Sequence, residues 1–84
     1  MRHARDDDLD RIEPLLAQMR TLDGLTEKSR GVFYRRSRAC LHFHADGADT
    51  YADVRFTGDE FERTRTTTKA EQRALVAAVR RALT

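Results

Sequence analysis

The stretch Arg38-Ala-Cys-Leu-His-Phe-His-Ala-Asp-Gly-Ala-Asp-Thr-Tyr-Ala-Asp-Val-Arg-Phe-Thr57 decides the fold. Apolar and polar side chains alternate along both of its halves, which is the pattern of β-strands. The segment Asp46-Gly-Ala-Asp49 between the halves is typical of a hairpin loop. We therefore expect two antiparallel strands, at residues 38–44 and 50–57.

The register of this hairpin follows from burial. A loop over 46–49 pairs Ala45 with Thr50 and places Leu41 opposite Val54, with the apolar side chains on one face. A slip of one residue would mix apolar and polar faces, so burial favours this register. The other face then carries six polar side chains together: Cys40, His42, His44, Tyr51, Asp53 and Arg55.

Helices are expected at both ends of the chain. Apolar residues recur at helical spacing over 10–22 and over 69–83. Asp10 and Thr68 each precede such a segment, with a glutamate three residues on, which is the capping-box pattern. A strand at 32–36 and a weaker one at 61–65 complete the elements.

The fold class predicted by this order, α-β-β-β-(β)-α, is α+β. An antiparallel sheet of three or four strands has one apolar face, and both helices pack on that face. Residues 1–9 are expected to form a charged tail and residues 10–84 a single domain. The expected core consists of Ile12, Leu15, Leu16, Met19, Leu41, Phe43, Val54, Phe56, Leu75, Val76 and Val79.

The composition excludes several classes of protein. A chain of 84 residues is too short for a two-domain enzyme. It has no apolar run of membrane-spanning length and no apolar segment after its N-terminal charges, so we expect neither a membrane helix nor a signal peptide. The single Cys40 fits a reducing, cytoplasmic setting. The excess of Arg over Lys suggests a GC-rich bacterial genome.

Two kinds of chemistry are conceivable on the polar face. His42 and His44 point to the same side of a strand, so with Cys40 or Asp53 they are weak candidates for a zinc site, although no second cysteine completes it. Cys40, His42 and Asp53 also have the residue types of a nucleophile, a base and its orienting group. Side chains two apart on a strand stand parallel rather than converge, so we predict no enzyme and no cofactor.

Binding is the more promising class of function. Arg30, Arg35, Arg36 and Arg38 gather near the first hairpin with Phe33 and Tyr34 among them, a pattern that suits contacts with phosphates and stacked bases. The net charge of only +2 weakens this nucleic-acid interpretation. Open sheet edges favour a protein partner or a homodimer instead.

Two family resemblances bear on the fold. The element order and the segment 68–75 resemble double-stranded-RNA-binding domains in topology, but that family's lysine cluster and glycine-rich loop are absent. The pattern Leu22-Asp-Gly-Leu-Thr-Glu27, Val32-Phe-Tyr34, Leu41-His-Phe-His44 and Ala52-Asp-Val-Arg55 resembles small uncharacterised proteins of actinobacterial type. It is also loosely similar to the luciferase-type domain of uncharacterised bacterial proteins. The resemblance implies a compact α+β domain and transfers no catalytic residue.

The sequence therefore predicts a small binding module that binds its ligand or partner through the polar sheet face and the arginine-rich hairpin. A homodimer is one expected form of this module. An anionic ligand would meet the arginines, and titration of the histidines would make its binding pH-dependent. Nucleic acid and zinc are the alternative ligands. The candidate site residues are Arg35, Arg36, Arg38, His42, His44, Tyr51, Asp53 and Arg55.

Overall fold

The computed structural model describes residues 1–84 and has an α+β fold, which confirms the predicted class. The sheet has six strands instead of three or four. The elements in chain order are β1 (Arg2–His3), α1 (Asp6–Arg11), α2 (Glu13–Arg20), β2 (Thr26–Ser29), β3 (Val32–Arg35), β4 (Arg38–Asp46), β5 (Asp49–Val54), β6 (Glu62–Arg65) and α3 (Lys69–Leu83).

The sheet is antiparallel, with the order β2-β3-β4-β5-β6. The short β1 pairs with the end of β4 that β3 leaves free, so that Arg2 lies opposite Ala45 and His3 opposite His44. The predicted register of the central hairpin is confirmed, with Leu41 opposite Val54. β4 therefore lies at the centre of the sheet and positions residues on both faces.

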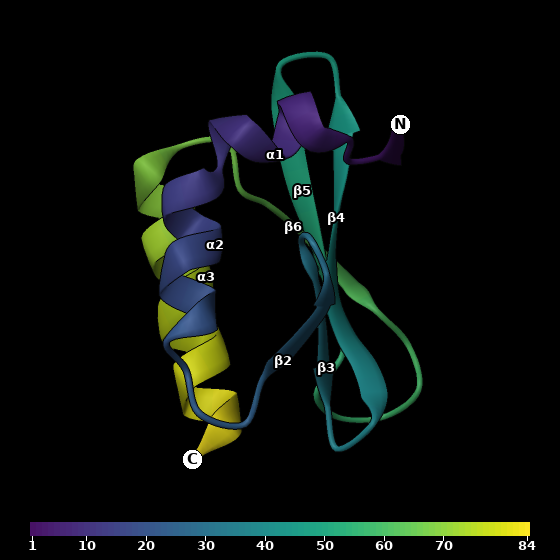
Figure 1. Ribbon diagram of the computed structural model, residues 1–84, viewed down its shortest axis with the longest axis vertical. Coiled ribbons are helices and arrows are strands. Elements are labelled where there is room, and N and C mark those ends of the chain that lie inside the picture. The colour runs from purple at the N-terminus through teal and green to yellow at the C-terminus, as the bar shows by residue number, and fades with distance from the viewer.

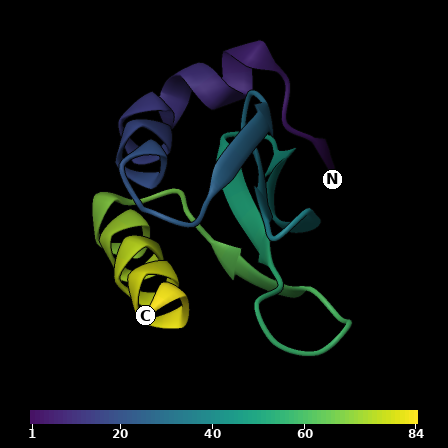
Figure 2. The same ribbon diagram turned by 60° about the horizontal axis from the view of Figure 1, so that its bottom comes forward.

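The helices cover one face of the sheet. Figure 1 shows α2 and α3 side by side on that face, and Figure 2 shows α1 crossing one end of the sheet. The predicted start of α3 is confirmed, because the Glu71 amide donates to Thr68 Oγ1 at 3.1 Å and the Thr68 amide donates to Glu71 Oε1 at 2.9 Å. No helix is both long and apolar enough to cross a membrane.

The N-terminal segment differs from the predicted tail. Residues 2–3 form β1, and the first helix begins at Asp6 rather than Asp10. Asp8 is buried and accepts a hydrogen bond from the Arg5 amide at 2.9 Å, so it closes the first turn of α1. Leu9 is buried with the core. The prediction failed because Asp8 is buried and paired with Arg2 and Arg11 rather than solvated.

The core contains the predicted residues with some additions. Nine of the expected side chains are buried, while Val54 and Phe56 pack against the core half-buried. Phe33 is fully buried opposite Leu41 and was not expected there. β2 was also missed, because Thr26-Glu-Lys-Ser29 is polar, largely exposed and lacks alternation.

Candidate functional site

The structure divides the predicted polar face between two places. The pairs His42–Asp53 and His44–Tyr51 form as predicted, on the sheet face away from the helices. Cys40 and Arg55 do not join them. Together with the arginines of the β3–β4 turn, these two residues line a pocket of about 210 Å³.

Cys40 leaves the polar face because of a β-bulge. Tyr34 pairs with Ala39, but Phe33 pairs with Leu41, so Cys40 is an extra residue in β4. Cys40 is buried in the core cluster, and its thiol lies 3.5 Å from the Phe33 carbonyl oxygen. Burial raises the pKa of the Cys40 thiol. The arrangement of Cys40 with His42 and Asp53 as nucleophile, base and orienting group is therefore not formed.

The β3–β4 turn is tight and conformationally unusual. Arg35 pairs with Arg38, and the two residues between them have positive φ angles, 53° at Arg36 and 66° at Ser37. Two positive φ angles in a two-residue loop belong to a type I′ turn, for which Asn-Gly is preferred. Three arginines thus come from one turn whose backbone is strained for these residue types.

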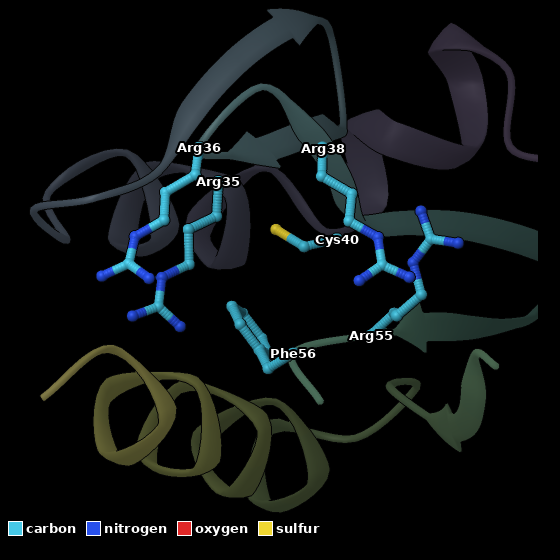
Figure 3. Close-up of a pocket in the computed structure, with 6 residues that line it drawn as sticks. All are labelled: Arg35, Arg36, Arg38, Cys40, Arg55 and Phe56. Atoms are coloured by element: carbon cyan, nitrogen blue, oxygen red, sulfur yellow. The ribbon is translucent and has the colours of Figure 1, made fainter. Parts of the chain in front are cut away.

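Figure 3 shows how the pocket is built. The side chains of Arg35 and Arg36 lie together at one end, those of Arg38 and Arg55 lie at the other, and the Cys40 thiol lies between the two ends. The Phe56 ring closes the side next to α3. The six lining residues are Arg35, Arg36, Arg38, Cys40, Arg55 and Phe56. The result is a hollow with four guanidinium groups and two apolar side chains.

The guanidinium groups are only partly neutralised. Arg35 donates to the Ala82 carbonyl at the end of α3 at 3.1 Å. Arg38 forms an ion pair with Asp59 at 3.0 Å. Arg36 is exposed and has neither an ion pair nor a side-chain hydrogen bond. The four arginines of the pocket therefore have one carboxylate partner, Asp59, and it is not among the lining residues.

Arg55 is held in place by the protein around it. Its Nη2 donates to the Ala39 carbonyl at 2.7 Å, and its guanidinium lies 4.2 Å from the Phe61 ring centroid, a cation–π contact. Its Nε is buried and has no hydrogen-bond partner. A buried donor without a partner is rare in folded proteins and calls for a functional explanation.

Two residues of the surface predicted for nucleic-acid binding, one basic and one aromatic, lie elsewhere. Arg30 points to the helices, where it forms ion pairs with Asp6, Asp10 and Glu13. Phe33 lies in the core and cannot stack on a base. The interleaved aromatic and basic side chains expected for nucleic-acid binding are thus not assembled.

The sheet face away from the helices carries a histidine and carboxylate cluster. His42 Nε2 lies 3.3 Å and His44 Nε2 lies 3.1 Å from Asp53 Oδ2. The sequence did not point to His3, whose ring centroid lies 4.5 Å from that of His44. Arg63, which lies within the weakly predicted fourth strand, donates to both carboxylate oxygens of Asp53.

The fold and these features define a small α+β domain with an arginine-lined pocket at one end of its sheet and a histidine cluster on the outer face. Comparison with protein-family models, characterised proteins and solved structures gave no significant match. The site is therefore interpreted from its own geometry.

Proposed function

We propose that the protein is a binding module for a small anion of the phosphate class, held in the pocket of Arg35, Arg36, Arg38 and Arg55. The observation that carries this proposal is one pocket with two arginine side chains at each end and no carboxylate among its six lining residues. Like charges at short range repel each other, and a bound anion removes that cost. Guanidinium groups also match the oxygen geometry of phosphate with paired hydrogen bonds.

The volume and lining restrict the ligand. About 210 Å³ is below the usual range of drug-sized sites, so the pocket suits a phosphate group with little attached to it. Arg36 has no internal partner and is free to bind, and the Nε of Arg55 is an unused donor. The proposal keeps the arginines of the predicted surface and leaves His42, His44, Tyr51 and Asp53 out of this site.

Calorimetric titration with pyrophosphate tests the proposal. We expect binding of one equivalent, and Arg36→Ala should weaken it about tenfold or more because a charge-assisted contact is lost. The matched control is Arg5→Ala, which removes an exposed arginine outside the pocket and should leave the affinity unchanged. Equal weakening by both variants, or no binding to wild type, would contradict the proposal.

The source of the phosphate is decided by a second titration. A single-stranded oligonucleotide carries the same phosphate chemistry in a polymer, but Phe56 is the one aromatic side chain that lines the pocket, whereas such ligands stack successive bases on several aromatic side chains. We therefore expect pyrophosphate to compete fully with any bound oligonucleotide. Oligonucleotide binding that survives both pyrophosphate and Arg36→Ala would favour the nucleic-acid alternative.

Self-association through a sheet edge is the other alternative. β2 and β6 are the edge strands of the sheet. All four residues of β6 are exposed, and three of them are charged, which disfavours addition of another strand. We therefore favour anion binding over self-association. A dimer is tested by measuring the mass of the protein in solution by analytical ultracentrifugation.

A further inference from the structure

Three side chains on the outer sheet face converge on one point. His42 and His44 come from β4 and Asp53 comes from β5, so all three stand on paired strands at the centre of the sheet. Each offers a ligand atom, and these atoms lie within 4.8 Å of one another. Side chains on paired central strands give a more precisely placed site than side chains on loops.

The Nε2 atom of His44 is the buried atom of this cluster that has no hydrogen bond. Both Asp53 oxygens already accept from Arg63, Oδ1 from Nε at 2.7 Å and Oδ2 from Nη2 at 2.9 Å. His44 Nε2 lies near Oδ2, but it is buried and has no hydrogen-bond partner. A shared cation would give this nitrogen the partner that the protein does not provide.

Two of the three distances within the cluster suit a tetrahedral transition-metal ion. With zinc bonds of about 2.0–2.1 Å, ligand atoms of a tetrahedral site lie roughly 3.4 Å apart. The separations of Asp53 Oδ2 from the two imidazole Nε2 atoms are 3.3 Å and 3.1 Å. Two nitrogens and one oxygen form a donor set that suits Zn²⁺ better than Mg²⁺ or Ca²⁺, which prefer oxygen alone.

The surroundings of Asp53 hold it in position beside the histidines. Its side chain is 10% exposed, and Arg63 donates to both of its oxygens. Hydrogen bonds to a ligating carboxylate are a common feature of metal sites, since they orient it.

His3 lies beside the cluster. It lies opposite His44 in the β1–β4 pair, and its ring centroid is 4.5 Å from that of His44 and 5.8 Å from that of His42. Residues opposite each other in a sheet share a face. All three histidines of the chain thus gather at one place.

We propose that His42, His44 and Asp53 form a binding site for one Zn²⁺ ion, with His3 as the fourth ligand. The site lies on the outer face of the sheet and shares no residue with the arginine-lined pocket, and the Phe61 ring contacts both His42 and Arg55. The zinc proposal does not rest on the proposed anion binding.

The proposal is tested on untagged protein freed of metal with a chelator and then titrated with Zn²⁺ by calorimetry. We expect one equivalent to bind to wild type and at least tenfold weaker binding to His42→Gln. The control Asp49→Asn removes a carboxylate of β5, the strand of Asp53, outside the cluster and should bind as wild type does. Folding of each variant is checked by circular dichroism. No stoichiometric binding to wild type, or unchanged affinity in folded His42→Gln, overturns the proposal.

Two further measurements cover the remaining outcomes. His3→Ala changes an exposed residue, and we expect about tenfold weaker Zn²⁺ binding; unchanged affinity would overturn the assignment of the fourth ligand. If the His42 variant does not fold, NMR of wild type decides, because Zn²⁺ should shift the imidazole signals of His42 and His44. Imidazole signals that stay in place on addition of one equivalent overturn the site. Arg36→Ala should bind Zn²⁺ normally, which separates this proposal from the anion site.

Discussion

Arg63 binds both carboxylate oxygens of Asp53, with Nε 2.7 Å from Oδ1 and Nη2 2.9 Å from Oδ2. The two residues lie directly opposite each other on β5 and β6. The Asp53 side chain is 10% exposed, so its charge depends on this partner rather than on water. The pair therefore attaches the edge strand to the centre of the sheet and holds the carboxylate beside the histidines.

The first prediction concerns this pair. In metal-free protein, Arg63→Ala should lower the melting temperature by several degrees, because a buried carboxylate loses its hydrogen-bonded partner. Arg65→Ala is the matched control on the same strand. Arg65 pairs with Asp49, whose side chain is 42% exposed, so its loss should change the melting temperature little. Calorimetric scans with a chelator present give the melting temperatures of both variants. Equal shifts in the two variants would contradict the prediction.

The second prediction separates stability from binding at the β3–β4 turn. Ser37 has a φ of 66° and does not line the pocket, so Ser37→Gly should stabilise the protein by about 1 kcal/mol without changing pyrophosphate affinity. Arg36→Gly relieves similar strain at a φ of 53° but removes a pocket cation. It should therefore raise stability while weakening pyrophosphate binding. Urea unfolding and calorimetry measure the two effects, and loss of stability in both variants would refute the strain argument.

The third prediction concerns Phe33. Its side chain is fully buried opposite Leu41, so Phe33→Ala should destabilise the protein by about 3–5 kcal/mol through the cavity it leaves. The neighbouring Tyr34 is half-buried, and Tyr34→Ala should cost less. Urea unfolding of both variants gives the comparison. A stable Phe33→Ala protein that binds oligonucleotide more weakly would instead support the stacking role considered from the sequence.

These residues show how far the sequence predicts the fold. The central hairpin is predictable because alternation along both strands leaves one register with an apolar face, and Leu41 opposite Val54 follows from it. Cys40 is not predictable in the same way. The tight turn pairs Arg35 with Arg38, yet core packing pairs Phe33 with Leu41, and the bulge at Cys40 reconciles the two.

The candidate sites show a similar limit. The hairpin register placed His42 beside Asp53, but a two-residue strand such as β1 has no periodicity, so only the folded chain brings His3 to His44. The pocket forms only with the bulge at Cys40 and with the hydrogen bond that Arg35 donates to the Ala82 carbonyl. Arg35 and Ala82 are 47 positions apart in the sequence. Contacts between distant segments are set by packing, and local pattern does not encode them.

The last prediction concerns acid stability and the N-terminal segment. Asp8 is buried and accepts hydrogen bonds from the Arg2 side chain, from the Arg5 amide at 2.9 Å and from Arg11 Nη2 at 2.9 Å. The bond from Arg2 is the largest cause that lowers the pKa of Asp8 below its usual value. Because the folded-state pKa is the lower one, Asp8 stabilises the fold at neutral pH. That stabilisation is lost as the pH falls below about 4 and through the lowered pKa.

Asp8→Asn isolates this contribution. At pH 6 the variant should melt below wild type, because the Arg2–Asp8 ion pair that joins β1 to α1 and the Arg11–Asp8 ion pair within α1 are gone. As the pH falls toward 2, wild type also loses them and the two melting temperatures should converge. The matched control Asp7→Asn changes a neighbouring exposed carboxylate and should follow wild type throughout. A gap between Asp8→Asn and wild type that stays constant from pH 6 to pH 2 would show that the charge of Asp8 does not hold the N-terminal segment in place.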